Sequence, residues 1–244
     1  MKRLLIKIKY DGTAYHGYQV QDNALTVQEV FQNAVEKVFK KRLDVIGCSR
    51  TDSGVHANMY CLCLDTDMNI SNEGVILALN TYLPNDIAVF DCTEVPQDFH
   101  PRYNCKSKEY LYVSYNGKYR NPFYDRYTYW YRYDLDEKYL DREAKAYVGK
   151  YDYSGFCSSK SDVEDTVREI YSFDVWREGD LVFFKVSGDG FLYNMVRIMV
   201  GTLLFVSQGK IKENELKSVI DSKDRKRAGR TAPPQGLYLN KIVY

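Results

Sequence analysis

Alternating apolar and polar positions open the chain and predict a strand. Residues 4–10 read LLIKIKY, so that leucine and isoleucine alternate with lysine and leave one polar face. The next pattern, LTVQEVFQNAVEKVF at residues 25–39, places apolar residues at helical spacing. It begins with a capping box of Thr26 and Glu29, which marks the start of a helix.

The rest of the chain continues to mix strand and helix patterns. After this helix the first part is expected to contain a strand near 43–48, a strand near 57–65, a helix near 72–82 and a strand near 86–92. The second part is expected to contain a strand near 106–115, a helix near 135–148, a hairpin near 167–187, helices near 191–207 and 213–221, and a last strand at 236–244. This order predicts an α/β protein of the α+β type, built from two ferredoxin-like (RRM-like) sandwiches with mainly antiparallel sheets. We expect the two domains to span residues 1–102 and 103–244.

Composition agrees with a folded globular chain, and the distribution of charge adds a possible partner. The 244 residues are 45% hydrophobic and 27% charged, with a net charge of only +1. Residues 102–132, however, hold seven basic side chains against Glu109 and Asp125, together with eleven aromatic ones, and a second basic run lies at 223–230. Mixed bases and aromatics suit phosphate contacts and base stacking in RNA binding. A solvated, tyrosine-rich sheet explains the same composition, so both interpretations stay open here.

Cysteine and histidine usage argues against a metal centre. The six cysteines form no CxxC pair and there are only three histidines, so neither a zinc site nor a disulfide framework is expected. The N-terminal stretch MKRLLIKIKY lacks the apolar core of a secretion signal, and we expect a cytoplasmic protein. The apolar stretch at 191–206 is too short and too polar to predict a membrane span.

Two ionisable residues of opposite charge are the first candidates for chemistry. Arg197 is the only charged side chain between residues 191 and 206, and the apolar helix around it predicts that it is largely buried. A buried guanidinium needs a carboxylate from another element, because this helix has no acid. We pair it with Asp52 in the stretch GCSRTDSGVHA, residues 47–57. A structural role for Arg197 and an ordinary Asx turn at Asp52 are the alternatives.

Other assignments for this stretch fit less well. A hydrolase triad of Asp52, Ser53 and His56 lacks the G-x-S-x-G turn, and neighbouring side chains on a loop diverge. One Asp and one His are too few ligands for a metal. A third candidate is Tyr110, which shares one face of the strand KSKEYLYVSY with Lys106, Lys108 and Tyr112. That face is either an exposed sheet surface or the floor of a cleft that stacks a base.

Several motifs together resemble a known family. The stretches YDGTAYHGYQ, TVQEV, SRTDSGVHA, ALNTYLP, FHPRYNCKSKEY, GFLYNMVRIMVGTLL and DRKRAGRTAPPQGLYL resemble the landmarks of the tRNA pseudouridine synthase A (TruA) family, in the same order and over nearly the whole chain. The departures are small: Ser49 stands for the family's usual glycine, Ser53 for its usual alanine and Tyr18 for its usual tryptophan.

The resemblance implies an enzyme that isomerises uridine to pseudouridine at positions 38, 39 and 40 of the tRNA anticodon arm, as a homodimer without metal or cofactor. By position in the motifs, Asp52 is the catalytic nucleophile, Arg197 pairs with it, and Tyr110 lies against the target base. Leu237 gives an apolar contact to the base and Arg50 fills the space of the extruded nucleotide, while Lys106 and Lys108 are expected to contact phosphates. A non-catalytic tandem ferredoxin-like RNA-binding protein, and a synthase of the same chemistry with other RNA targets, remain as alternatives.

Overall fold

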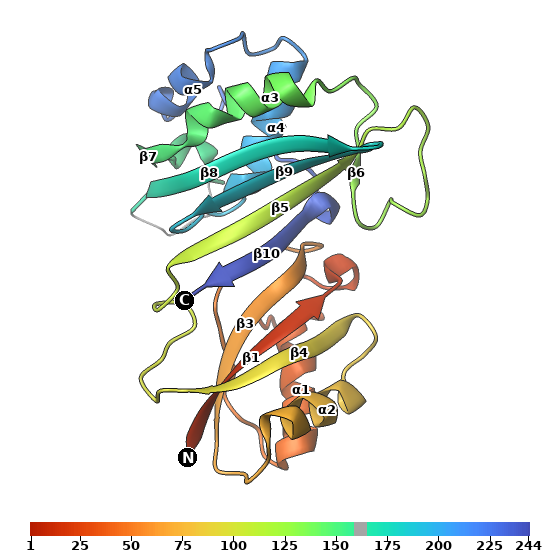
Figure 1. Ribbon diagram of the computed structural model, residues 1–244, viewed down its shortest axis with the longest axis vertical. Coiled ribbons are helices and arrows are strands. Elements are labelled where there is room, and N and C mark those ends of the chain that lie inside the picture. Colours follow the sequence, from red (N-terminus) through yellow and green to blue (C-terminus); the bar gives the residue numbers. More distant parts are fainter. Residues whose placement is uncertain (159–164) are drawn as a thin grey trace. The chain divides into compact units, whose positions relative to one another are not determined.

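The computed structural model describes residues 1–158 and 165–244, which form two compact units (Figure 1). The first unit comprises residues 1–106 together with 238–244, and the second comprises residues 107–237. The last strand of the chain therefore belongs to the first unit, whereas the boundary expected from the sequence assigns it to the second domain. That boundary, between residues 102 and 103, stays a prediction about domains.

The first unit contains a four-stranded sheet with a short additional strand. Its strands are β1 (Lys2–Tyr10), β2 (Ile46–Gly47), β3 (His56–Thr66), β4 (Ile87–Val95) and β10 (Leu237–Val243). The order is β4-β1-β3-β10, with β1 antiparallel to both β3 and β4. The expected strand at 43–48 shrinks to the two residues of β2, which pair with the middle of β3. The start of the same edge is taken by β10, which runs parallel to β3 with Tyr238 opposite His56.

Two helices of the first unit form where the sequence places them. Helix α1 (Val27–Phe39) begins after Thr26, whose side chain accepts the backbone N–H of Glu29, as the capping box predicts. Helix α2 (Asn72–Tyr82) begins after Ser71 and ends just before Pro84. The short 3₁₀ turn η1 (Gly12–Ala14) follows β1 and is capped by Asp11. With β1, β3 and β4, the two helices make the strand-helix alternation of a ferredoxin-like sandwich.

The second unit has an antiparallel sheet with helices packed against it (Figure 1). Its strands are β5 (Ser107–Tyr115), β6 (Tyr129–Trp130), β7 (Gly149–Asp152), β8 (Val167–Glu178) and β9 (Leu181–Gly188), in the order β5-β9-β8-β7 with β6 beside β5. Its helices are α3 (Glu137–Ala144), α4 (Met195–Ser207) and α5 (Leu216–Ser222), and its 3₁₀ turns are η2 (Lys145–Tyr147), η3 (Ser154–Phe156) and η4 (Pro234–Gly236). The mixed α/β architecture with mainly antiparallel sheets confirms the predicted fold class.

Two helices of this unit start later than their apolar patterns suggest. The helix expected at 191–207 begins only at Met195, because Asn194 lies in the left-handed region with φ 61° and interrupts the helical backbone. The helix expected at 135–148 is limited to residues 137–144, where Asp136 accepts the N–H of Tyr139 as the cap. Apolar spacing identifies both helices but does not fix their first residue.

Helix α4 is closely packed against a return of the chain near residue 230. A Cβ atom on Gly201 would stand 1.7 Å from the carbonyl oxygen of Arg230, and one on Gly229 would stand 2.3 Å from that of Gly201. Only glycine allows this backbone approach. The buried Thr202 hydroxyl donates to the carbonyl of Ile198 (2.7 Å) and accepts the N–H of Gly229 (2.8 Å), which joins the two segments.

Two buried hydroxyls of the second unit are expected to differ in their contribution to stability. Thr202→Val leaves the Gly229 N–H without its acceptor and should lower the free energy of unfolding by about 1–3 kcal/mol. The Ser114 hydroxyl on β5 is fully buried and has no hydrogen-bond partner among the described residues. Ser114→Ala should therefore leave stability unchanged or raise it. Urea unfolding of both variants measures the difference, and equal losses would contradict these hydrogen-bond assignments.

Candidate active site

The loop that carries Asp52 is fixed by the segment that follows β1. Residues 48–55 form no helix or strand, and Asp52 is half-buried within them. The backbone N–H of Tyr18 donates to the Thr51 carbonyl (3.2 Å), and the N–H of Gly54 donates to the Tyr15 carbonyl (3.2 Å). The two bonds lie on either side of Asp52 along the loop. Its backbone is therefore positioned from outside the loop.

Side chains and glycines complete this attachment. The hydroxyls of Tyr10 and Thr51, both buried, are 2.8 Å apart and hydrogen-bonded. A Cβ atom on Gly17, which has φ +88°, would stand 2.5 Å from the Thr51 carbonyl oxygen, and one on Gly12 would stand 2.0 Å from that of Val55. The glycines of the YDGTAYHGYQ motif are thus explained by close backbone approach to the Asp52 loop.

The polar neighbours of Asp52 in sequence have structural contacts of their own. Ser53 Oγ donates to the Tyr15 carbonyl (3.3 Å). His56 is buried; its Nδ1 accepts the N–H of Gly12 (3.0 Å) and lies 3.2 Å from Asp11 Oδ1. The His56 ring also stacks on Tyr238, with centroids 4.8 Å apart. These contacts give both residues a role in holding the loop, which agrees with the argument against a hydrolase triad.

The predicted substrate-binding bases are distributed over both units. Arg50 is exposed, two residues before Asp52, and no hydrogen bond or ion pair to its guanidinium occurs within residues 1–158 and 165–244. Lys106 is exposed in the first unit, and its backbone N–H donates to the Val243 carbonyl (2.8 Å). Lys108 is half-buried on β5 in the second unit.

The tyrosine face of β5 is buried within the second unit. Tyr110 is 7% exposed and meets the ring of Phe191 edge-on, with centroids 5.1 Å apart. Tyr112 is fully buried and donates its hydroxyl to the carbonyl of Pro233 (2.9 Å). Burial raises the pKa of Tyr112 well above its ordinary value, although the charge of Arg197 acts in the opposite direction. Leu237, just after η4, is also buried. The face is therefore not an open sheet surface.

Arg197 lies in the first turn of α4 and is held by two acceptors of its own unit. Its Nε donates to the carbonyl of Ala232 (2.7 Å) and its Nη1 donates to Asn194 Oδ1 (2.7 Å). The Ala232 N–H returns a bond to the Arg197 carbonyl (3.0 Å). Arg197 is of intermediate burial, and it stands near the start of the helix and not in its apolar middle.

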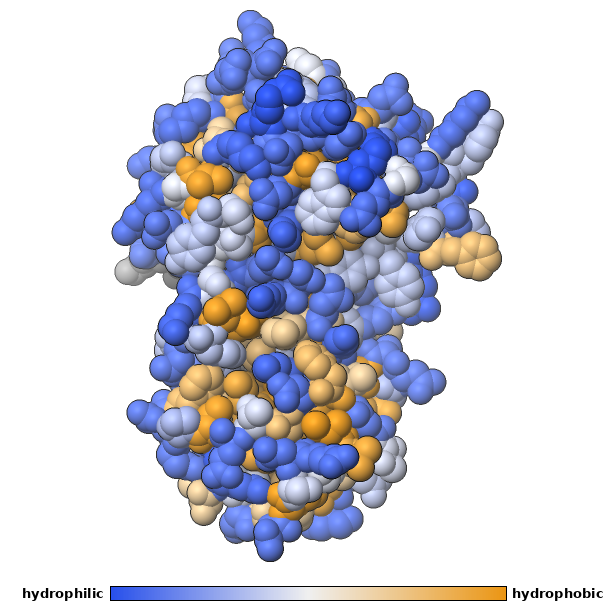
Figure 2. All heavy atoms as spheres, viewed as in Figure 1, coloured by the Kyte–Doolittle hydropathy of each residue, from blue (hydrophilic) through white to orange (hydrophobic). Residues whose placement is uncertain are grey.

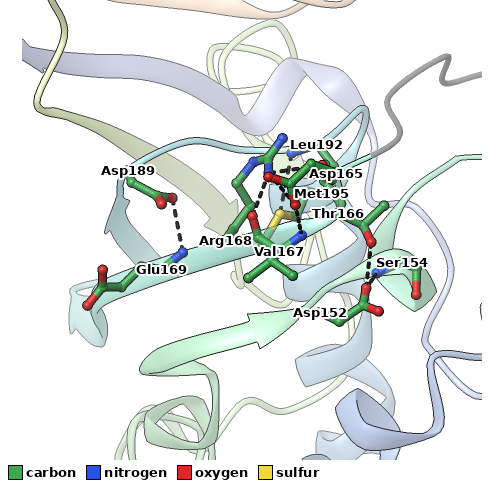
Figure 3. A network of polar contacts seen from close by, with 10 residues as sticks. All are labelled: Asp152, Ser154, Asp165, Thr166, Val167, Arg168, Glu169, Asp189, Leu192 and Met195. Atoms are coloured by element: carbon green, nitrogen blue, oxygen red, sulfur yellow. Dashed lines mark hydrogen bonds and ion pairs between the residues drawn. The ribbon is translucent and has the colours of Figure 1, made fainter.

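The turn before α4 is held in place by polar contacts with β8 (Figure 3). Asp189 and Glu169 exchange two bonds: the Glu169 N–H donates to Asp189 Oδ1 (3.0 Å) and the Asp189 N–H donates to the Glu169 carbonyl (3.0 Å). The Leu192 N–H meets the sulfur of Met195 at 3.4 Å. These contacts fix the segment that leads into the helix of Arg197.

Asp152, in the same network, anchors the beginning of β8. It accepts the Thr166 hydroxyl (2.6 Å) and the Ser154 N–H (3.0 Å), and its other oxygen lies 2.9 Å from Lys223 Nζ. The Thr166 hydrogen bond, with support from Lys223 and Ser154, holds the pKa of Asp152 well below its usual range. The carboxylate is therefore ionised at neutral pH.

Part of the basic run at 223–230 has a structural role. Besides Lys223, Arg225 donates to the Gly229 carbonyl (2.8 Å) and the Thr231 hydroxyl, and Arg227 donates to Ser218. Lys226 and Arg230 are exposed. The run is thus a partly ordered segment, and only some of its charges point to solvent without an intramolecular bond among the described residues.

Within the described part of the chain, no three His, Cys, Asp or Glu side chains gather closely enough to hold a metal ion. A search of the same residues for a helix long and apolar enough to cross a membrane finds none. The absence of a metal or cofactor from the reaction stays a prediction.

Comparisons with known proteins assign the chain to a class and a family. A family model described as tRNA pseudouridine synthase matches residues 6–104 and 144–244. Proteins named tRNA pseudouridine synthase A are 44% identical in Thermoanaerobacter sp. (strain X514), 42% in Ruminiclostridium cellulolyticum and 43% in Acetivibrio thermocellus. Each alignment covers 100% of this chain and 100% of the relative. The class is therefore that of RNA-modifying isomerases that make pseudouridine.

The chain belongs to the tRNA pseudouridine synthase family. It is an enzyme, which decides against the alternative of a non-catalytic RNA-binding protein. The family assignment gives the class of reaction, whereas the role of each candidate site residue stays a prediction. The contacts of Tyr10, Thr51 and Asn194 had no signal in the sequence patterns, because each depends on a partner distant in sequence or on an unusual backbone angle.

The hydrogen bond between Tyr10 and Thr51 should affect turnover more than substrate binding. Thr51→Val removes the hydroxyl beside Asp52, and we expect kcat to fall roughly tenfold or more while the Kd for tRNA stays near that of the wild type. Thr51→Ser keeps the hydroxyl and should restore most of kcat. Single-turnover kinetics and binding titrations separate the two effects. A loss of tRNA affinity alone, or no rescue by serine, would show that this bond does not position the loop.

Proposed function

We propose that this enzyme converts uridine to pseudouridine at positions 38, 39 and 40 in the anticodon arm of tRNA, and that Asp52 is its nucleophile. The observation that supports this best is the attachment of the Asp52 loop to residues 10–18, which holds one half-buried carboxylate next to an exposed arginine. The full-length relatives carry the name of this activity. Because the reaction takes place on tRNA, we place the enzyme in the cytoplasm.

The proposed reaction leaves the composition of its substrate unchanged. The glycosidic bond between C1′ and N1 breaks, the uracil turns, and C1′ joins C5. C5 then loses its proton while N1 gains one, so that product and substrate have the same composition. No electron acceptor or activated donor is required. This is the chemical reason to expect that the reaction needs neither cofactor nor metal.

Arg197 is proposed as the partner of Asp52. Arg197 lies in the first turn of α4, where the helix dipole disfavours a cation, so a carboxylate beside it would be stabilising. A carboxylate would neutralise the guanidinium, and the guanidinium would in turn keep that carboxylate ionised in a dry site. A planar, two-pronged donor also fixes the orientation of the nucleophile, which lysine cannot do.

The remaining residues are proposed to bind the substrate. Extruding a uridine from a stacked helix costs a few kcal/mol. The exposed Arg50 guanidinium is proposed to occupy the vacated space, and Tyr110 and Leu237 are proposed to contact the extruded base. Lys106 and Lys108 are proposed to contact phosphates. As implied by the family resemblance, we also propose a homodimer, for which sedimentation equilibrium is the direct measurement.

The decisive variant for this proposal is Asp52→Asn. Release of tritium from [5-³H]uridine-labelled tRNA should fall by roughly a thousandfold or more, because the amide is not a nucleophile. The affinity for tRNA and the unfolding midpoint should stay close to those of the wild type. Asp22→Asn, at an exposed position of the same unit, is the matched control and should keep full activity.

Mapping of pseudouridine in the product tRNA tests the assigned positions. Modification at 38, 39 and 40 by the wild type supports the proposal, whereas modification elsewhere favours a synthase with other RNA targets. Appreciable turnover by Asp52→Asn would remove Asp52 from the nucleophile role.

A further inference from the structure

The chain between β5 and α3 displays aromatic side chains to solvent. We call residues 116–133 the aromatic loop; it leaves the end of β5, projects beside the sheet and includes β6 (Figure 1). Its exposed aromatic residues, with their exposed fractions, are Tyr119 (72%), Phe123 (88%), Tyr124 (37%), Tyr127 (40%) and Tyr133 (49%). Single exposed apolar residues are ordinary, but five aromatic ones in eighteen residues indicate a binding surface.

The aromatic loop is ordered by its own hydrogen bonds. Asn116 donates its backbone N–H to the Asp180 carbonyl (2.7 Å) and its side-chain amide to the carbonyls of Tyr131 (2.7 Å) and Tyr133 (2.8 Å). The indole N–H of Trp130 donates to the Gly117 carbonyl (3.1 Å). Hydrogen bonds thus hold both ends of the aromatic loop against the sheet. Because the backbone of the loop is already ordered there, binding a ligand costs it less conformational entropy.

Phe123 is presented by a closed turn. Its N–H donates to Asn121 Oδ1 (3.1 Å), and the Tyr124 N–H donates to the Asn121 carbonyl (3.0 Å). The neighbouring Tyr124 ring packs on Tyr115, with centroids 5.1 Å apart, and is much less exposed (37%) than Phe123 (88%). The turn therefore anchors the Tyr124 ring and leaves the Phe123 ring in solvent, where it contributes little to the folded core.

Cations accompany the exposed rings. Lys118 lies over Tyr119 (5.3 Å from the ring centroid), Arg126 over Tyr127 (5.6 Å) and Arg132 over Tyr133 (4.9 Å). Arg120 lies over Trp130 (5.9 Å from the ring centroid) and forms an ion pair with Asp125. The sequence of the aromatic loop contains four basic residues and one acidic residue, Asp125. On the face shown in Figure 2 this projection is mostly hydrophilic, with an apolar group at its outer edge. Positive charge beside flat apolar faces fits a polyanion that carries bases.

The aromatic loop also lies between the two segments that the family model matches. The family match stops at residue 104 and resumes at 144, so the whole segment falls in the unmatched interval.

We propose that the aromatic loop is an RNA-binding element that stacks an unpaired base of the tRNA on Phe123, while Lys118, Arg120 and Arg126 contact the flanking phosphates. This rests on the proposed function only for the identity of the RNA. A second copy of the chain is a poorer occupant, because a two-fold contact through this loop would bring like charges together.

The test is the affinity of Phe123 variants for an unmodified tRNA transcript, measured by fluorescence anisotropy. Phe123→Ala should raise the Kd about fivefold or more, because a base stacked on an aromatic ring loses its support. Phe123→Tyr keeps the ring and should bind as the wild type does. Phe90→Ala is the matched control, since Phe90 is also exposed (39%) and lies 5.0 Å beneath Lys9, but on β4 of the first unit. Its Kd should not change.

Two further arms separate the alternatives. A blunt RNA duplex, which offers no unpaired base, should bind Phe123→Ala and the wild type equally. Sedimentation of Phe123→Ala should give the mass of the wild type; a lower mass would show that the loop joins two copies and would overturn the proposal. An unchanged Kd for tRNA would overturn it as well. If the wild type bound tRNA through Phe123 but formed no pseudouridine, the binding element would stand and the proposed activity would fail.

Discussion

The hydrogen bonds between residues 10–18 and the loop at 48–55 determine where Asp52 stands. A loop without helix or strand has no ladder of its own, so its carboxylate is only as well positioned as the contacts that reach it from elsewhere. Here the backbone N–H groups of Tyr18 and Gly54 form hydrogen bonds between the two segments, one on either side of Asp52. The Tyr10 hydroxyl, at the end of β1, is hydrogen-bonded to that of Thr51, the residue before Asp52. Glycines at 12 and 17 allow the two backbones to approach. Catalysis by differential binding of a transition state needs such a fixed group, because a mobile carboxylate would spend binding energy on being ordered.

In the second unit, close packing of two backbone segments likewise positions Arg197. Helix α4 is pressed against the chain near residue 230 through Gly201 and Gly229, and Thr202 bonds across this contact. The contact sets the position of Ala232, whose carbonyl accepts Arg197 Nε, while the left-handed Asn194 supplies the second acceptor. In both units, then, a functional candidate is oriented by backbone groups that glycine brings within reach. This explains why the glycine-containing motifs of the sequence surround the candidate residues without being chemically reactive.

The sequence is sufficient for the fold class and for the helices with local signals. Helices α1 and α2 appear at their predicted positions because Thr26 and Ser71 cap them through neighbouring residues. Prediction fails where an unusual backbone angle or a contact distant in sequence determines the structure: α4 starts four residues late, after the left-handed Asn194, and β2 keeps only two residues, which pair with Cys63 and Leu62 of β3. For the site, the motif locates Asp52, but the bonds that hold it come from residues some 40 positions earlier.

The proposed pairing of Asp52 with Arg197 is tested most directly by a double-mutant cycle on thermal unfolding, with the variants Asp52→Asn, Arg197→Met and their combination. Methionine matches the apolar helix in volume but leaves the carboxylate without its cation. If the two side chains interact, the double variant should be more stable than the sum of the single losses predicts, by about 1 kcal/mol or more. Additivity within about 0.5 kcal/mol would contradict the pairing and leave Arg197 with a structural role within its own unit.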